Sequence, residues 1–152
     1  MAIPTLGVIM NSIDANILVY AFNEEAEEHP IAKSFIEQAM DHPNEWIVSD
    51  QTLLEFYSVI RNPVIMKHPL GAREACSKLQ FVRSQTGFLH CSYESTLWPS
   101  VMQILSKAKF PYRRTFDAVL AATLIGNGVE VLYTRNTKDF HGFGFKVINP
   151  ID

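Results

Sequence analysis

Cysteine is scarce in this chain, which has two cysteines, Cys76 and Cys91, among 152 residues. Neither belongs to a C-x-x-C pair or lies beside a histidine, so the sequence predicts neither a zinc site nor a disulfide framework. We expect both to be reduced thiols in the core. The five histidines show no metal-ligand spacing either, which favours surface or hydrogen-bonded histidines over catalytic ones.

Long apolar runs and an excess of positive charge are also missing. The longest apolar run, 118–126, has about half of the ~20 residues that a membrane span needs, and residues 1–10 lack the charged head and apolar core of a signal peptide. These absences predict a cytoplasmic protein without membrane contact. The formal net charge is −3, which argues against coating nucleic acid through bulk charge, so any such contact must be local.

What the chain does have is a regular alternation of short apolar runs with segments of helical period, without repeats or linkers. This alternation predicts an α/β fold with a central, mostly parallel sheet of four to five strands. Its length fits one domain over residues 1–152. Residues 1–9 are a candidate mobile extension of that domain, because a compact unit can begin at Met10.

The predicted elements follow from apolar spacing and from residues that begin or end helices. Strands are expected at 8–14, 46–49, 88–91, 129–134 and 146–148, and helices at 16–22, 30–40, 50–60, 71–84, 97–108 and 116–125. Asp50 and Thr115 are the expected N-caps of the third and sixth helices. Gly126, Asn127 and Gly128 are expected to end the sixth helix through left-handed conformations.

Four acidic residues belong to elements that a parallel sheet brings to one end. Ligands of such sheets bind beyond the carboxyl ends of the strands, where Asp14 closes the first strand and Asp139 follows strand 129–134. Glu55 interrupts an apolar helical segment, and Asp117 lies near the start of a helix. Each also has a simpler explanation: a helix cap for Asp14, a half-exposed surface position for Glu55, a helix-dipole partner for Asp117 and a turn cap for Asp139.

The convergence of these acids is the argument for a metal site. Two carboxylates about 4 Å apart repel by roughly 4 kcal/mol at an effective dielectric constant near 20, so a cluster needs protonation or a bridging cation. Ligation by oxygen alone, without histidine or cysteine, suits Mg²⁺ or Mn²⁺ better than zinc.

The residues around these acids carry a family resemblance. The segments 12–21, the Glu55 helix, 116–122 and 134–140 resemble the successive motifs of PIN-domain ribonucleases, and within that family the VapC toxins of toxin–antitoxin pairs. The resemblance extends over residues 10–150. It implies a three-layer α/β/α fold, metal-dependent cleavage of single-stranded or structured RNA, a homodimer, and a cognate antitoxin as partner.

The same resemblance assigns roles to individual positions. Asp14, Glu55 and Asp117 match the three principal acids of the family, and we expect all three to be metal ligands. Many members have a fourth acid two residues after the threonine that corresponds to Thr134, where this chain has Asn136. Either Asp139 supplies the fourth catalytic acid, or Asn136 orients a metal-bound water.

The expected mechanism uses the metal to activate water for in-line attack on a phosphate, which leaves a 5′-phosphate. Asp14 and Asp117 anchor the metal, and Glu55 holds a ligand water or a second ion. Candidate contacts to nucleic acid are Asn16, Arg113, Arg114, Thr134 and Asn136. For each of the two arginines, a solvated surface charge is the simpler explanation.

Two other functions compete with this one. A flavodoxin-like receiver is possible because Asp14, Thr134 and Lys146 fall near strand ends, although that scheme gives Glu55 and Asp117 no purpose. A catalytically silent PIN module that only binds RNA or protein is the third possibility. Retention of all three principal acids weighs against it.

Overall fold

A parallel sheet organises the chain, for which a computed structural model describes residues 8–152. The extension predicted at residues 1–9 therefore lies outside the described residues, apart from Val8 and Ile9. The strands are β1 (Met10–Ile13), β2 (Ile47–Ser49), β3 (Leu89–Cys91), β4 (Val129–Tyr133) and β5 (Lys146–Ile148). Hydrogen bonds join them in the orders β1-β4-β5 and β2-β3, with every pair parallel.

Side chains and one bridge connect these two parts of the sheet. Asn11 on β1 forms an isolated parallel bridge with Trp46, next to β2. The Ser12 hydroxyl donates to the Ile47 carbonyl at 2.5 Å, which ties the two strands together. The five strands thus lie in the order β3-β2-β1-β4-β5, which confirms the predicted parallel sheet.

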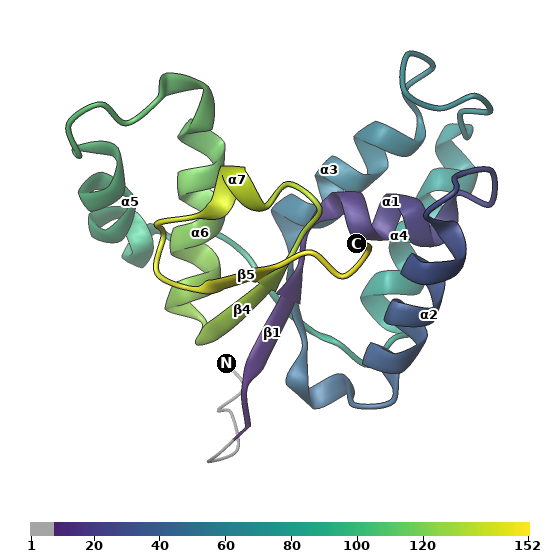
Figure 1. Ribbon diagram of the computed structural model, residues 1–152, viewed down its shortest axis with the longest axis horizontal. Helices are drawn as coiled ribbons and strands as arrows, with labels where there is room; N and C mark the ends of the chain where they lie inside the picture. The colour runs from purple at the N-terminus through teal and green to yellow at the C-terminus, as the bar shows by residue number, and fades with distance from the viewer. Residues whose placement is uncertain (1–7) are drawn as a thin grey trace.

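Helices cover both faces of the sheet (Figure 1). They are α1 (Ala15–Phe22), α2 (His29–Met40), α3 (Asp50–Ile60), α4 (Ala72–Ser84), α5 (Trp98–Leu105), α6 (Thr115–Gly126) and α7 (Thr137–Phe140), with short 3-10 turns at Pro43–Glu45, Ser95–Leu97 and Tyr112–Arg114. The first four helices lie on one side, and α5 and α6 lie on the other. This arrangement confirms the predicted three-layer α/β/α fold. None of the helices in residues 8–152 is both long and apolar enough to cross a membrane.

Alternating side chains of the strands divide the core between these layers. Val48 contributes to the apolar cluster that contains Phe56 of α3, whereas the preceding residue, Ile47, belongs to the cluster that contains Leu124 of α6. This division is expected because successive side chains of a strand point to opposite faces. The α1–α4 layer and the α6 layer therefore have separate cores that meet only through the sheet.

Four local predictions were wrong. Gly126 is the last residue of α6 and Asn127 has a φ of −103°, so of the three residues expected in left-handed conformations only Gly128, with a φ of 83°, adopts one. Ser49, rather than Asp50, caps α3, since its hydroxyl accepts from the Thr52 amide at 3.1 Å. Thr115 is the first residue of α6 and not its cap. Cys76 is exposed rather than a core thiol, because α4 buries Ala75 and Val82 and turns the next residue after Ala75 toward solvent.

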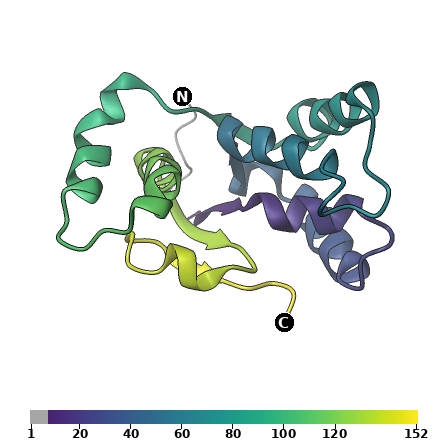
Figure 2. The same cartoon turned by 90° about the horizontal axis from the view of Figure 1, so that it is seen from above.

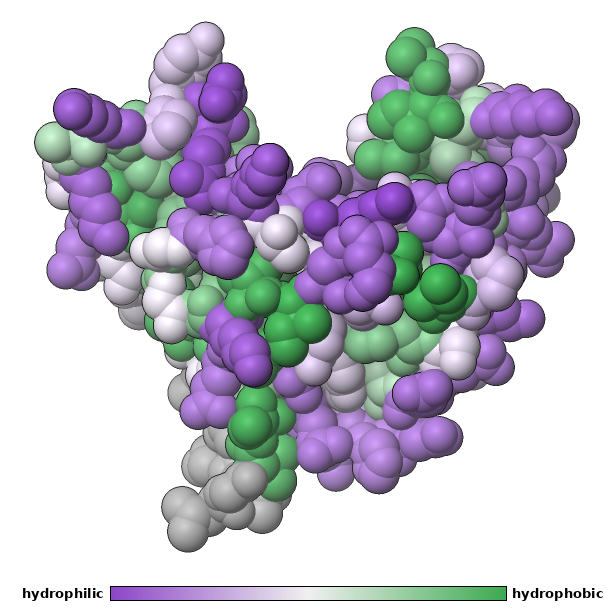
Figure 3. Space-filling model, in the orientation of Figure 1, coloured by the Kyte–Doolittle hydropathy of each residue, from purple (hydrophilic) through white to green (hydrophobic). Residues whose placement is uncertain are grey.

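A notch separates two arms of the molecule at the carboxyl edge of the sheet. Figure 3 shows this hollow between the arm formed by α3 and α4 and the arm formed by α5 and α6. Seen from above, α6 stands nearly end-on between α5 and the rest of the domain (Figure 2). β1 and β4 end near the base of the notch in Figure 1, so the chain segments that follow these two strands begin there.

Candidate active site

Asp14 directly follows β1 and is fixed by hydrogen bonds to both carboxylate oxygens. Oδ1 accepts from the Ala15 amide at 2.8 Å, which caps α1, and Oδ2 accepts from the Thr134 hydroxyl at 2.8 Å. The side chain is 6% exposed. The capping role expected as an alternative is therefore real, and it holds the carboxylate in place at the end of the strand.

Burial raises the pKa of Asp14 above its ordinary value. The hydrogen bonds from Thr134 and Ala15 act in the opposite direction, and the negative charge of Asp139 adds to the increase. A buried carboxylate with a raised pKa gains from a nearby cation, because the cation favours the ionised form.

Thr134 connects the ends of β1 and β4 and is fully buried. Its hydroxyl donates to Asp14 and accepts from the Asn16 side-chain amide at 3.3 Å and from the Asn136 backbone amide at 3.0 Å. The Thr134 hydroxyl is buried and already has these partners, which disfavours the predicted contact with nucleic acid, so that contact stays a prediction. Its hydrogen bond holds the Asp14 carboxylate in place.

Glu55 lies on one arm and Asp117 on the other, and the negative charge of Asp117 acts on Glu55. Glu55 lies on the exposed side of α3, and partial burial followed by the charges of Asp14 and Asp117 raises the pKa of its carboxyl. Burial followed by the charges of Asp139 and Asp14 raises the pKa of Asp117, against the opposing effect of Arg114. The acid that follows β1 and the acids on α3, α6 and α7 therefore lie close enough for their charges to interact.

This donor set suits a hydrated divalent ion more than a closed cage. Among residues 8–152, no group of three His, Cys, Asp or Glu side chains is close enough to hold one ion directly. Mg²⁺ usually keeps several waters and takes one or two carboxylates, and oxygen is the preferred donor of both Mg²⁺ and Mn²⁺. The tight cluster assumed for the repulsion estimate is absent, but the chemistry of the donors fits such an ion.

Comparison with known proteins decides the family. The family model of the PIN domain matches residues 12–146, which include Asp14, Glu55, Asp117 and Asp139. The chain belongs to the PIN-domain family. It is 34% identical over 143 residues to Ribonuclease VapC24 of Mycobacterium tuberculosis, an alignment that covers 93% of this chain and 97% of that protein.

Solved structures of PIN-fold proteins resemble this chain in fold. The toxin VapC20 of M. tuberculosis, described as cleaving the sarcin-ricin loop, has a TM-score of 0.64 at 15% identity and covers 85% of this chain and 92% of its own. VapBC2 of Rickettsia felis, bound to a DNA fragment from its promoter, also has a TM-score of 0.64 at 15% identity, with 93% and 100% coverage.

The position of the fourth acid in this PIN domain favours Asp139 over Asn136. The charge of Asp139 acts on both Asp14 and Asp117, although its side chain is exposed on α7. Asn136 precedes α7, and its backbone amide donates to Thr134. Asp139 as the fourth catalytic acid stays a prediction, supported by these charge effects.

The residues predicted to contact nucleic acid differ in whether their side chains already have partners within the protein. Arg114 donates to the Asp139 carbonyl and lies 4.8 Å from the Phe143 ring centroid, so it holds α7 against the start of α6. Arg113 is exposed. Asn16 donates to Asp14 and accepts from the Arg135 amide, both at long range of 3.3–3.4 Å. Arg113 is thus the better placed of the two adjacent arginines for a phosphate contact.

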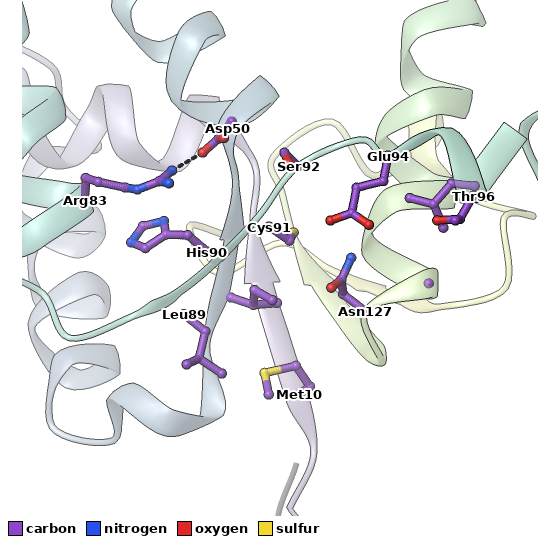
Figure 4. A pocket seen from close by; sticks show the side chains of 13 residues that line it. Met10, Asp50, Arg83, Leu89, His90, Cys91, Ser92, Glu94, Thr96 and Asn127 are labelled. Carbon is purple, nitrogen blue, oxygen red and sulfur yellow. Dashed lines mark hydrogen bonds and ion pairs between the residues drawn. The ribbon is translucent and has the colours of Figure 1, made fainter. Parts of the chain in front are cut away.

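A cavity of about 630 Å³ lies away from the four acids (Figure 4). The cavity is lined by residues of β3, and it has the ion pair of Asp50 and Arg83 on one side and Glu94 and Asn127 on the other. Burial and the charge of Arg83 lower the pKa of His90, which favours a neutral ring. The cavity is lined by none of the sequence-predicted site residues, and no pattern in the sequence indicated it.

The receiver hypothesis fails on the position of its cation. Lys146 is the first residue of β5 and pairs with Val131 in the middle of β4, whereas Asp14 and Thr134 follow the carboxyl ends of their strands. The lysine therefore lies at the wrong end of its strand for a site at that edge.

Gln51, which donates to the Phe116 carbonyl, is a residue near the acids that sequence reasoning missed.

Proposed function

We propose that this PIN domain is a Mg²⁺- or Mn²⁺-dependent endoribonuclease that cleaves single-stranded or structured RNA in the cytoplasm, as the toxin of a VapBC-type pair. The observation that carries the proposal is the position of Asp14, which Ala15 and Thr134 hold at the carboxyl edge of the sheet, where its charge raises the pKa of Glu55 and Asp117. The similarity to Ribonuclease VapC24 supports the choice of RNA as substrate.

The residues divide the work according to how firmly each is held. Asp14 is rigid and buried, so it and Asp117 would anchor the metal, and Glu55 would hold a ligand water or a second ion. The bound ion supplies a Lewis acid that activates water and neutralises charge on the phosphate. Thr134 orients Asp14 through its hydroxyl, and Arg113 contributes positive charge for the RNA backbone.

Metal dependence is tested by cleavage of a labelled RNA in Mn²⁺ and in EDTA. We expect cleavage in Mn²⁺, none in excess EDTA, and recovery when Mn²⁺ is restored, because the acids alone offer no nucleophile or Lewis acid. Products should carry a 5′-phosphate, since water rather than a ribose 2′-hydroxyl attacks. Undiminished cleavage in EDTA, or a 2′,3′-cyclic phosphate end, would reject the proposed chemistry.

The proposed partners are a cognate antitoxin and a second copy of the chain. VapBC2 of R. felis is a solved toxin–antitoxin pair that shares the fold, which supports an antitoxin as partner. Expression of this chain should arrest growth, and co-expression of its cognate antitoxin should relieve the arrest. The homodimer has support from exposed apolar side chains that border the notch, Leu54 on α3 and Phe116 on α6.

Replacing Phe116 with glutamate is expected to convert the dimer into a monomer. Phe116 is 75% exposed, and a charge in place of an apolar contact removes hydrophobic burial and adds a desolvation cost. Sedimentation velocity measures the oligomeric state. Ile31→Glu on α2 is the matched control, since Ile31 is also exposed but lies on another helix. A Phe116→Glu protein that sediments like the wild type would place the dimer contact elsewhere.

A further inference from the structure

A single glutamine joins the two helices that border the notch. Nε2 of Gln51, in the first turn of α3, donates to the Phe116 carbonyl of α6 at 3.0 Å. No other hydrogen bond links α3 to α6 among residues 8–152. The carbonyl lies in the first turn of α6, so the contact holds the end of the helix that carries Asp117.

Both ends of this hydrogen bond lie next to a proposed metal ligand. Gln51 precedes Glu55 by four residues, and residues at this spacing lie on the same face of a helix. Phe116 immediately precedes Asp117. The bond therefore joins the two helix segments that carry Glu55 and Asp117.

Two features of the structure favour separation of the arms that this hydrogen bond joins. The α3 helix packs in the cluster that contains Phe56, whereas Ala118 of α6 packs in a different cluster with Val101 of α5. The two arms thus have separate apolar cores. The like charges of Glu55 and Asp117 repel each other across the notch, which favours wider separation of the arms when no cation is present.

We propose that Gln51 is a positioning residue that holds α3 and α6 at the separation at which Glu55 and Asp117 act on the same divalent ion. The inference rests on the proposed function, because it assigns Gln51 a role in that site. Gln51 donates its amide to a backbone carbonyl, so the role assigned to it is positional.

The first test measures the distance between the arms in metal-free protein. Spin labels are placed on Cys76 of α4, which is exposed, and on Gln103→Cys of α5. The native Cys91 should stay unlabelled because burial raises the pKa of its thiol to about 12. Gln51→Met keeps the side-chain length and removes the donor. We expect its distance distribution, measured by double electron–electron resonance, to be longer or broader than that of the wild type.

Gln80→Met is the matched control, since Gln80 is an exposed glutamine of α4 that donates to Ser84 within its own helix at 2.6 Å. Its distance distribution should equal that of the wild type. Equal distributions for Gln51→Met and wild type would overturn the inference, whether or not the chain cleaves RNA.

The second test measures Mn²⁺ binding without RNA, from the electron paramagnetic resonance signal of the free ion. We expect Gln51→Met to bind Mn²⁺ about fivefold more weakly, the scale of one exposed hydrogen bond, and to melt within a few degrees of the wild type. Its cleavage rate should recover at saturating Mn²⁺, which a general loss of structure would not allow. Altered distances with unchanged Mn²⁺ affinity would overturn the positioning role.

These outcomes separate the inference from the proposed function. If the wild type binds Mn²⁺ and cleaves RNA but Gln51→Met matches it in both distance and affinity, only the inference fails. If the wild type neither binds Mn²⁺ nor cleaves RNA, both fail, and the label distances still report whether Gln51 ties the two arms together.

Discussion

Asp14→Asn should lower Mn²⁺-dependent RNA cleavage by at least about 100-fold, while the protein remains folded. The substitution keeps the size of the side chain and removes the charge that would bind the ion. Asparagine is also a favoured N-cap, so the amide of Ala15 keeps its acceptor at the start of α1. Asp14 is the most rigidly held of the acids, which is why its loss should have the largest effect.

The measurement is the initial cleavage rate at saturating Mn²⁺, together with a thermal melt of each protein. Asp50→Asn is the matched control, because Asp50 is also at the carboxyl end of a strand but pairs with Arg83 beside the cavity of Figure 4. It should cleave at close to the wild-type rate. Wild-type activity in Asp14→Asn would show that Asp14 is only a helix cap and would end the proposed mechanism.

The elements of the fold follow from apolar spacing because each element buries one or two faces. Segment 129–134 was predicted as a strand and forms β4 (Val129–Tyr133), since its residues are apolar and mostly β-branched or aromatic apart from the exposed Glu130, and such a run fits a largely buried strand. The helix at 97–108 was predicted three residues too long, because α5 ends at Leu105 and no glycine or proline marks that end. Boundaries depend on tertiary contacts that spacing alone does not contain.

The site was predictable to the extent that strand order brings residues together. Asp14 and Thr134 lie at adjacent strand ends, and parallel pairing of β1 with β4 makes their contact necessary. That Thr134 holds Asp14 from a fully buried position was not indicated by the sequence. The Gln51 contact depends on the angle between two helices that belong to different cores, and no sequence pattern specifies this angle.

Asp117→Asn should raise the melting temperature of the metal-free protein at pH 7. Loss of a favourable charge at the N-terminus of α6 costs about 0.3–1 kcal/mol. Burial and the charges of Asp139 and Asp14 nevertheless raise the pKa of Asp117 and so disfavour its ionised form, and we expect these effects to exceed the contribution of the helix dipole. A neutral side chain of the same size removes those effects, so the free energy of unfolding should increase.

The sign of the pH dependence follows from the direction of that pKa shift. Well below the unfolded-state pKa, near 3.8, Asp117 is protonated in both states and the substitution changes nothing. As pH rises from the unfolded-state pKa to the raised folded-state pKa, the unfolded wild type ionises before the folded one, so the wild type loses stability and the variant does not. Melts in EDTA should therefore show equal stability near pH 3 and a variant more stable by a few degrees at pH 7.

Saturating Mg²⁺ should reverse the order of the two melting temperatures at pH 7, since the ion stabilises the folded protein whose side chain binds it. A lower melting temperature for Asp117→Asn in EDTA at pH 7 would mean that the helix dipole outweighs the repulsion among the acids, and the case for a cation at this edge of the sheet would lose its electrostatic basis.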